Sequence, residues 1–341
     1  MKRSRDHATL ADVALRAGVG KTTVSRVING AHKVSAQTLE RINKVILELG
    51  YHPSQAARSL KGERSRTLGL ILPRIADPFF ACCAEVVHSL ARAHGYLLMV
   101  AATDYDPQLE IKEIYTLLRH RVDGILISPA DSASRKLSDI VAEINIPVVT
   151  FNHPLMRARV RSVLADNYQG ARLATEHLIG HGCQRVLCLG GDATLYSVKE
   201  RQRGYRDAMR AAELDVHMEE SANDSAEVAR VIRAEWKKQK PIDGIFAVRN
   251  LITIYAFQTL QAMRIKIGEQ VALIGFDDFD LASTLRPAVS VVKQPVEEMA
   301  SRAANVLFDE IENTTHSRRA SIKLQTSLIL RNSCGCRAVT R

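Results

Sequence analysis

The sequence of 341 residues has no long apolar run: none approaches the ~18–20 residues that a helix needs to cross a bilayer. The first ten residues, MKRSRDHATL, include basic side chains, but no apolar stretch follows them, so a secretory signal is not expected. Apolar residues make up 46% and charged residues 25% of the chain, which excludes a disordered composition. We therefore expect a globular protein of the cytoplasm, without a membrane partner.

Catalytic motifs are also missing. The sequence contains no HExxH, no GxSxG and no Cys–His pair at a recognisable spacing, so we do not expect an enzyme, a catalytic residue or a cofactor. The six cysteines form no CxxC pair and are expected to be reduced thiols without a metal, although a metal or redox role is the alternative. They are Cys82, Cys83, Cys183, Cys188, Cys334 and Cys336.

Acidic residues are scarce in one part of the chain only. Residues 1–66 hold 13 Lys/Arg and 5 Asp/Glu, a net charge of +8, whereas the remaining 275 residues hold 34 and 32, a net charge of +2. A basic module on a nearly neutral body is typical of nucleic-acid binding. A solvated basic tail is the alternative, but residues 1–66 are too strongly patterned for a tail.

The string RAGVGKTT at residues 16–23 is close to a phosphate-binding loop, which would indicate a nucleotide ligand. Such a loop must follow a buried strand. The preceding apolar residues Leu10, Val13, Ala14 and Ala17 instead have the spacing of a helix, and Leu15 stands where the strict motif requires its first glycine. The context therefore favours a helix that ends at a glycine turn.

A second helix follows Gly18, with Val24, Val27 and Ile28 facing the first helix. A third begins at Ser35 and carries Leu39, Ile42, Val45, Ile46 and Leu49 before Gly50. Two short helices joined by a tight turn and braced by a third form a helix-turn-helix. Its second helix presents Lys21, Thr22, Ser25 and Arg26 outward, where they could reach bases and phosphates in a major groove.

The strings TLADVALRAGVGKTTVSRVING, KVSAQTLERINKVILELGYHP and AARSLKG resemble the DNA-binding headpiece of the LacI/GalR repressors. Two residues depart from that pattern: Gly20 replaces the usual Ser/Thr helix cap, and Ser54 replaces a common Asn. The resemblance implies base contacts by Lys21, Thr22 and Arg26, and a short hinge helix over residues 54–62. The full set of DNA-binding residues that it implies is Thr9, Lys21, Thr22, Thr23, Ser25, Arg26, Asn29, Ser35, Tyr51, Ala57 and Leu60, with Leu60 wedged between bases in the minor groove.

From Thr67 onward, short apolar runs alternate with helical stretches. The runs are residues 68–73, 96–101, 123–128, 147–151, 185–191, 243–248 and 271–276, and the helical stretches include residues 80–94, 108–120, 168–181 and 225–238. Continuous apolar runs suit parallel strands buried on both faces, so the pattern predicts doubly wound α/β sheets. There is about twice the material that one such sheet needs, which predicts two lobes. The resemblance implies the same: a periplasmic-binding-protein-like domain whose lobes are joined by three crossovers.

The predicted organisation has an all-α helix-turn-helix headpiece with its hinge helix at residues 1–62, a linker at 63–66, and an effector-binding and dimerisation domain at 67–341. Lobe 1 is predicted to comprise about residues 67–163 and 294–323, and lobe 2 about residues 164–293 and 324–336. No heptad leucines follow Arg331, so a homodimer is expected rather than a tetramer assembled through the tail.

Small ligands bind outside the carboxyl ends of the strands in such sheets. Polar and aromatic residues follow the predicted strands, and the family resemblance places several of them at an effector site. The predicted effector-binding residues are Asp77, Phe79, Phe80, Ser128, Asn152, Arg201, Arg249, Phe276 and Asp277. Arg249 stands where the family usually has Asn, and a second cation beside Arg201 would suit a carboxylate or phosphate on the effector. Arg249 pointing out to solvent is the alternative.

The sequence thus predicts a transcriptional regulator, a repressor, that binds double-stranded operator DNA under the control of a small-molecule effector. Two other classes of protein share part of this pattern. A solute-binding transport protein would share the body but not the basic headpiece, and a ParA-like ATPase would need the phosphate loop.

Overall fold

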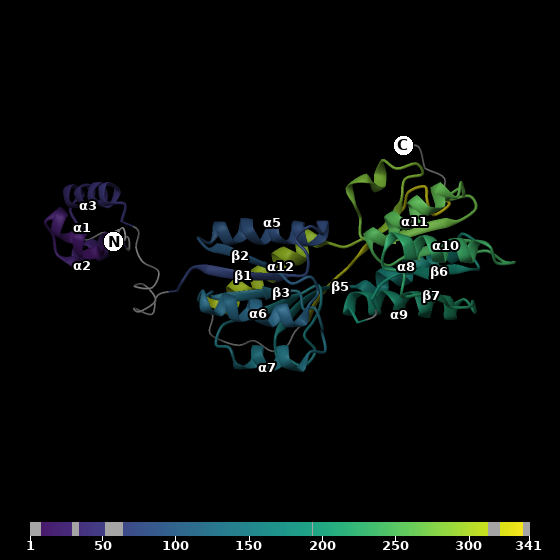
Figure 1. Cartoon of the computed structure of the whole chain (residues 1–341), viewed down its shortest axis with the longest axis horizontal. Helices are drawn as coiled ribbons and strands as arrows, with labels where there is room; N and C mark the ends of the chain where they lie inside the picture. The colour runs from purple at the N-terminus through teal and green to yellow at the C-terminus, as the bar shows by residue number, and fades with distance from the viewer. Residues whose placement is uncertain (1–7, 29–33, 52–63, 193, 313–320, 337–341) are drawn as a thin grey trace, which may run out of the picture. The chain divides into compact units, whose positions relative to one another are not determined.

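The computed structural model describes residues 8–28, 34–51, 64–192, 194–312 and 321–336. The chain divides into two compact units, residues 1–65 and residues 66–341 (Figure 1). The described part of the first unit is helical, and the second unit contains two six-stranded sheets with helices against both faces. Among the described residues, no helix combines the length and the apolar character that crossing a bilayer requires.

The helices of the first unit are α1 (Leu10–Ala17), α2 (Lys21–Ile28) and α3 (Ala36–Leu49). Thr9 and Asp12 cap α1 reciprocally: the Asp12 backbone N–H donates to Thr9 Oγ1 at 3.3 Å, and the Thr9 backbone N–H donates to Asp12 Oδ2 at 2.8 Å. These hydrogen bonds lower the pKa of Asp12. Gly18 ends α1 with φ 63°, a left-handed conformation that suits glycine. The helix-turn-helix predicted over this stretch is therefore present, and a strand does not precede Gly18.

Apolar side chains from all three helices form one small core. Its buried members are Val13, Ala14, Ala17, Val24, Val27, Ile42, Val45 and Tyr51. Each fully buried Val or Ile stabilises such a core by about 1.5–3 kcal/mol. Leu39 of α3 is 42% exposed and is not among the residues of this core.

The first sheet of the second unit belongs to lobe 1. Its strands are β1 (Thr67–Leu72), β2 (Leu97–Ala102), β3 (Gly124–Ile127), β4 (Val148–Phe151), β5 (Arg161–Ala165) and β11 (Ser321–Leu324). They are all parallel, in the order β11-β5-β4-β3-β1-β2. Helices α5 (Pro78–Ala93) and α12 (Val296–Glu312) cover one face, and α6 (Pro107–Arg119) and α7 (Arg135–Glu143) cover the other (Figure 1).

The alternation of side chains along β1 explains this layering. Leu68, Leu70 and Leu72 pack with α5 and α12, whereas Ile71 packs with α6 and α7. Gly69 lets α6 approach closely, since a Cβ there would lie 2.6 Å from Leu117 Cδ1. Both faces of the strand are therefore buried, as its continuous apolar run predicted.

The second sheet belongs to lobe 2. Its strands are β6 (Val186–Leu189), β7 (His217–Glu219), β8 (Gly244–Ala247), β9 (Ala272–Phe276), β10 (Ser290–Lys293) and β12 (Ser327–Ile329), in the order β12-β10-β9-β8-β6-β7. Only the edge strand β12 is antiparallel among these paired strands. Helices α8 (Asn167–Gly180) and α9 (Tyr196–Ala211) pack on one face, and α10 (Ser225–Trp236) and α11 (Asn250–Ala262) pack on the other, while a 3₁₀ helix, η1 (Asp280–Ser283), follows β9.

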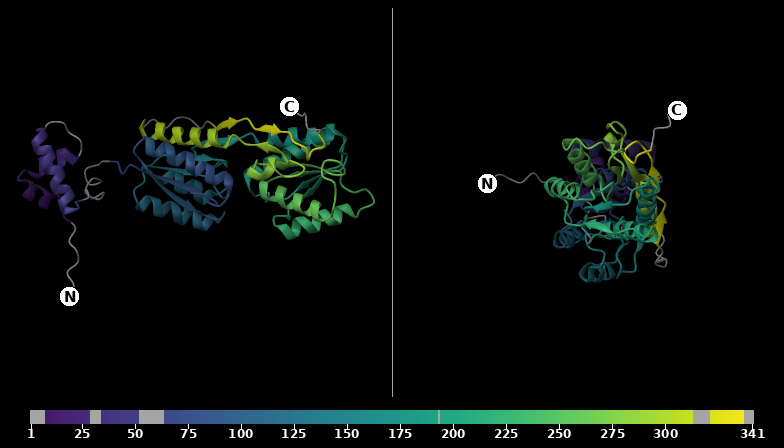
Figure 2. Two further views of the ribbon diagram at one scale, coloured as in Figure 1. Left: turned by 90° about the horizontal axis from the view of Figure 1, so that it is seen from above. Right: turned by 90° about the vertical axis from the view of Figure 1, so that its right-hand side faces the viewer.

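The chain crosses between the lobes three times, as predicted: from β5 to α8, from β10 to α12 and from β11 to β12. Figure 2 shows the last crossing in yellow, where β11 and β12 follow one another from lobe 1 into lobe 2. The apolar runs found in the sequence form β1–β4, β6, β8 and β9, so the two-lobed α/β fold class is confirmed. The strands that the sequence did not single out are short, three to five residues each.

Candidate DNA-binding helix and effector cavity

The outer face of α2 carries the side chains predicted to meet DNA. Lys21, Thr22 and Arg26 are exposed, and Thr23 and Ser25 are half-buried. Within the part of the chain that the structure describes, Lys21 and Arg26 form no ion pair. Val24 and Val27 hold the opposite face of α2 in the core, which fixes the direction of the exposed face. Exposed cations that form no ion pair with another described residue are suited to contacts with phosphate or guanine.

The other predicted DNA-binding residues have structural roles of their own. Thr9 caps α1, and exposed Ser35 caps α3 by accepting a hydrogen bond from the Thr38 backbone N–H at 3.3 Å. Tyr51 is only 8% exposed and packs in the headpiece core, so its ring serves the fold. Asn29, Ala57 and Leu60, with the hinge helix, lie outside the described residues.

In the second unit, a cavity lies between the carboxyl ends of strands from both lobes. Lobe 1 contributes residues that follow β1, β2 and β4, and lobe 2 contributes residues that follow β6, β8, β9 and β10. The lining residues are Asp77, Phe79, Phe80, Tyr105, Asn152, His153, Leu195, Ser197, Val198, Arg201, Arg249, Asn250, Asp277 and Gln294. The position agrees with the rule that doubly wound sheets bind ligands at these strand ends.

Arg201 of α9 is the most constrained of these side chains. Its Nε donates to Asn167 Oδ1 at 2.8 Å, and its Nη1 donates to the carbonyl oxygen of Val248 at 2.8 Å. The guanidinium carbon lies 3.7 Å from the centre of the Phe276 ring. Burial lowers the pKa of Arg201, but the Asp277 carboxylate, 3.3 Å from Nη1, favours the charged form. Arg201 is therefore a fixed cation in the wall of lobe 2.

Asp277 and Gln294 continue this polar wall. Gln294 Nε2 donates to Asp277 Oδ1 at 2.5 Å, while the other carboxylate oxygen of Asp277 faces Arg201. Gln294 is 3% exposed, and its Oε1 has no hydrogen-bond partner among the described residues. The neighbouring Asp278 points elsewhere and forms a two-pronged ion pair with Arg331 at 3.0 Å. The two aspartates thus direct their carboxylates at different arginines and do not form an acid–base pair.

Lobe 1 contributes mainly rings and one carboxylate. Phe79 and Phe80 meet edge to face with 4.9 Å between ring centres. Asp77 caps α5 by accepting a hydrogen bond from the Phe79 backbone N–H at 3.0 Å. Burial raises the pKa of Asp77, and this hydrogen bond opposes the effect. The lobe 1 wall is consequently more apolar than the lobe 2 wall.

His153 connects the two lobes directly. It follows β4 in lobe 1, and its Nδ1 lies 2.9 Å from the carbonyl oxygen of Pro129. Its Nε2 lies 3.0 Å from Ser197 Oγ at the start of α9 in lobe 2. Burial lowers the pKa of His153 to about 4. The ring is therefore neutral, with Nδ1–H donating to Pro129 and the Ser197 hydroxyl donating to Nε2.

Arg249 faces the cavity and not only the solvent. It precedes α11, is half-buried, and its guanidinium carbon lies 5.9 Å from the centre of the Tyr105 ring across the cavity. Unlike Arg201, it forms no ion pair with any residue in the described ranges. The cavity therefore holds two arginines and the carboxylates of Asp77 and Asp277, with Arg249 as the cation that lacks a carboxylate partner.

Three lining residues have left-handed backbone conformations: Tyr105 with φ 62°, Asn152 with φ 62° and Asp277 with φ 71°. Asn and Asp tolerate this region, but for a bulky residue such as Tyr it costs roughly 1–3 kcal/mol. Strain of this kind concentrates at binding sites. All three residues line the cavity.

Most of the predicted effector residues line the cavity, with two exceptions. Ser128 is buried behind Asn152, which donates to its Oγ at 3.4 Å, and Phe276 is buried beneath Arg201. The prediction missed several lining residues that the same strand-end rule could have found: Tyr105 after β2, His153 after β4, Leu195, Ser197 and Val198 after β6, Asn250 after β8, and Gln294 after β10.

Comparison with known families finds a match for each of the two units. The profile of bacterial regulatory proteins of the lacI family matches residues 9–54. The profile of periplasmic binding proteins and the sugar-binding domain of the LacI family matches residues 65–331. The headpiece and the two-lobed domain define a DNA-binding transcriptional regulator with an effector domain, which is not an enzyme. The chain belongs to the LacI family.

Relatives and solved structures span almost the whole chain. It is 29% identical to the HTH-type transcriptional repressor PurR of Aliivibrio fischeri over 333 residues, 96% of this chain and 98% of that protein. It is 31% identical to the ribose operon repressor of Halalkalibacterium halodurans, over 89% of this chain and 90% of that protein. A lac repressor dimer bound to operator and an anti-inducer has the same fold, with a TM-score of 0.85 at 22% identity over 96% of this chain and 99% of that one.

Proposed function

We propose that this chain is a cytoplasmic repressor that binds a near-palindromic operator as a homodimer and responds to a hydroxyl-rich small molecule, a sugar or sugar derivative. One observation carries the proposal: a polar cavity closed by side chains from two lobes, in a chain that also contains a helix-turn-helix. A ligand that touches both lobes binds their two arrangements with different affinity, and this difference is what shifts a conformational equilibrium.

The proposed operator contact is the exposed face of α2. Arg26 is assigned a bidentate contact with guanine O6 and N7, and Lys21 and Thr22 are assigned neighbouring base contacts. Thr23 and Ser25 are assigned to phosphates or to the helix start. The resemblance to the family supports a further contact by Leu60 in the minor groove, which would kink the duplex. Two headpieces in a dimer match two half-sites, and the solved lac repressor is a dimer on its operator.

The proposed effector contact follows from the polar wall of lobe 2. Asp277 and the unpartnered Gln294 Oε1 are hydrogen-bond acceptors, which suit hydroxyl groups. Arg201 is a fixed donor beside them, and the rings of Phe79 and Tyr105 can pack on the apolar face of a small molecule. Arg249 is positioned for a carboxylate or phosphate, so a sugar acid or sugar phosphate belongs to the proposal.

The operator is best found by selection from random duplex DNA with the full-length protein, followed by binding measurements on the selected site and on random DNA. Arg26→Ala should lose ~1–3 kcal/mol on the selected site and relax one base position, while weak, salt-sensitive binding stays. The control is Arg41→Ala, which replaces an exposed arginine on α3. It should lower the affinity for the selected site and for random DNA to a similar extent. If Arg26→Ala loses affinity equally for both DNAs, Arg26 is a phosphate contact. If the selection enriches no specific site, the proposal is wrong.

The effector can be found independently of the operator. A thermal-shift screen of sugars, sugar acids, phosphosugars and purines uses the rise in stability that a bound ligand causes. We expect one of the hydroxyl-rich classes to raise the unfolding temperature and to change operator affinity. A hit that raises stability without changing operator affinity would separate binding from regulation and contradict the proposed control.

A further inference from the structure

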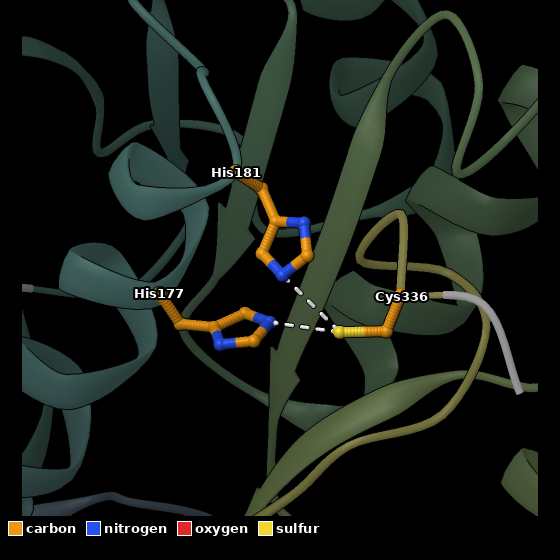
Figure 3. Close-up of side chains that lie close together, drawn as sticks. All are labelled: His177, His181 and Cys336. Carbon is orange, nitrogen blue, oxygen red and sulfur yellow. Dashed lines mark hydrogen bonds between the residues drawn. The ribbon is translucent and has the colours of Figure 1, made fainter. Parts of the chain in front are cut away.

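Three side chains of lobe 2 that play no part in the effector cavity meet at the outer surface of the lobe (Figure 3). Cys336 Sγ lies 3.4 Å from His177 Nε2 and 3.2 Å from His181 Nε2. The three ligand atoms all lie within 4.8 Å of one another. Figure 3 shows both imidazoles directing these nitrogens at the same sulfur atom.

The two histidines are placed by the end of α8. His177 lies in its last turn, and His181 is the residue that ends it, with its backbone N–H donating to the carbonyl oxygen of His177 at 3.1 Å. Residues four apart lie on one face of a helix, the spacing that metal-binding helices use for paired histidines. The ring centres are 4.5 Å apart, tilted by 47°, so the rings converge without stacking flat.

Cys336 is held opposite them by its own segment of chain. The backbone N–H of Leu273 in β9 donates to the carbonyl oxygen of Ser333 at 2.7 Å, and Ser333 Oγ donates to the carbonyl oxygen of Leu273 at 2.6 Å. Cys334 is fully buried in the core of lobe 2. The thiol is therefore presented by a segment anchored to the sheet, so the three-residue arrangement is set up by the fold.

The two sulfur–nitrogen distances match those of a tetrahedral metal centre. With zinc bonds of about 2.3 Å to sulfur and 2.0–2.1 Å to nitrogen, a tetrahedral angle places sulfur and nitrogen ligands about 3.5 Å apart. The two S···N separations, 3.4 and 3.2 Å, lie within a few tenths of an ångström of that value. Two imidazoles and one thiolate are also a donor set that Zn²⁺ prefers, whereas Mg²⁺ and Ca²⁺ prefer oxygen ligands.

We propose that His177, His181 and Cys336 form a binding site for a thiophilic transition-metal ion of the Zn²⁺ class. On binding, the Cys336 thiol loses its proton to solvent, the sulfur and both Nε2 atoms bond to the ion, and the fourth position is left to water or an exogenous ligand. His181 is exposed, so the ion has a path of entry. The bound ion links the end of α8 to the segment that follows β12, two parts of lobe 2 that are 155 residues apart in sequence.

The test uses the tag-free, full-length protein, from which metal is removed with a chelator and the chelator is then removed. A phosphine keeps the cysteines reduced, and a titration of free thiols verifies this. Co²⁺ is the probe, because a thiolate ligand gives a near-ultraviolet charge-transfer band and a tetrahedral site gives intense visible bands. We expect one Co²⁺ per chain, displaced by one Zn²⁺, and a rise in unfolding temperature with Zn²⁺.

Variants separate this site from adventitious binding. Cys336→Ser should abolish the charge-transfer band, and His177→Ala and His181→Ala should each weaken Co²⁺ binding about tenfold or more. The matched controls are Cys82→Ser, a half-buried cysteine of lobe 1, and His120→Ala, an exposed histidine that ends α6 as His181 ends α8; both should bind Co²⁺ as the unaltered chain does.

Two outcomes would overturn the proposal. One is an unaltered, fully reduced chain that shows no charge-transfer band at stoichiometric Co²⁺, which would leave the cluster as a thiol hydrogen-bonded to two imidazoles. The other is a band that survives Cys336→Ser, which would place the metal at other residues. Circular dichroism of each variant confirms that a lost band reflects a lost ligand and not an unfolded lobe.

Discussion

The two lobes have similar sheets but offer the cavity different chemistry. Lobe 2 supplies Arg201, Asp277 and Gln294, which are already hydrogen-bonded to one another or to the backbone. Lobe 1 supplies the rings of Phe79 and Tyr105 together with the hydrogen-bonded side chains of Asp77, Asn152 and His153. A wall whose polar groups are oriented before a ligand arrives loses little free energy in ordering them. Under the proposed function, lobe 2 is therefore expected to select the effector's hydroxyl pattern, and the rings of lobe 1 are expected to pack against it.

Removing the fixed cation of lobe 2 should have the largest effect. Arg201→Ala leaves Asp277 Oδ2, Asn167 Oδ1 and the Val248 carbonyl without the donor that Arg201 supplies, so the free energy of unfolding should fall by about 3–5 kcal/mol. The effector-induced rise in unfolding temperature should disappear. Urea denaturation and thermal shift measure the two effects, and Arg210→Ala, an exposed arginine of the same helix, should change neither.

A milder variant keeps this prediction testable if Arg201→Ala does not fold. Asp277→Asn keeps the size of the side chain and removes its charge. It should fold and lose most of the effector response while keeping operator affinity, because the headpiece is a separate unit. Full effector response in Asp277→Asn would contradict the assignment of the lobe 2 wall as the selective one.

The unpaired cation offers the next test. If the effector is acidic, Arg249→Ala should weaken its binding by about 1.5–3 kcal/mol, the range for hydrogen bonds to charged groups. Binding of the neutral analogue should be weakened much less. Calorimetry with a sugar and the corresponding sugar acid measures both, and Arg233→Ala on α10 is an exposed control in the same lobe. Equal losses for the two ligands would rule out an anion contact by Arg249.

The lobes should also differ in their response to pH, because lobe 1 buries two groups that titrate in an accessible range. His153 has a pKa of about 4 in the folded chain, below its ordinary 6.5, so its contribution to stability is complete above pH 6.5 and is lost as the pH falls toward 4. Burial raises the pKa of Glu110 to about 7, above its ordinary 4.5, so its contribution is complete below pH 4.5 and is lost as the pH rises toward 7.

Between pH 4.5 and 6.5 the two contributions have opposite slopes and nearly cancel. In His153→Asn only the Glu110 contribution remains. The free energy of unfolding of this variant, relative to the unaltered chain, should therefore fall with rising pH by up to about 1.4 kcal/mol per pH unit. Glu110→Gln should show the reverse. Urea denaturation across this pH range measures both, and parallel stability curves for all three proteins would disprove this account.

The smallest effect is expected from the rings of lobe 1. Phe79→Ala removes one aromatic contact with the effector, and its affinity should fall by about 0.5–1.5 kcal/mol. Tyr115→Ala, an aromatic residue of lobe 1 that is 48% exposed and outside the cavity, is the control. A loss from Phe79→Ala as large as that from Asp277→Asn would mean that both walls select the ligand equally.

Much of the fold could be predicted because parallel strands that are buried on both faces have continuous apolar runs in the sequence. Runs such as residues 68–73 are apolar at every position, since both faces are covered. Strands β7 and β12 are three residues long at sheet edges, and half-buried side chains gave no such run. The local sequence pattern could not predict these two strands, because they are defined by their pairing with a neighbouring strand and not by a run of apolar residues.

The cavity was predictable in position more than in detail. The strand-end rule found Asp77 and Asp277, and the family resemblance found Arg201, but which side chain forms the lining depends on rotation about the last residue of each strand. Phe276, the last residue of β9, points into the core, and Asp277 with φ 71° turns into the cavity. The metal-type cluster was invisible to spacing rules because Cys336 is 155 residues from His181 in the chain.

The three crossings of the chain have a consequence for the order in which the protein is made. Lobe 1 is complete only when α12 and β11 have joined it, yet both follow nearly all of lobe 2 in the sequence. Until then, the face of the sheet formed by Leu126, Val149 and Phe151 lacks Ala303 and Leu307 of α12, and β5 lacks its edge partner β11. During synthesis on a ribosome, lobe 1 therefore emerges before lobe 2 but completes its fold only after most of lobe 2 has emerged. Until then it exposes an apolar surface and an unpaired strand edge, to which a chaperone can bind.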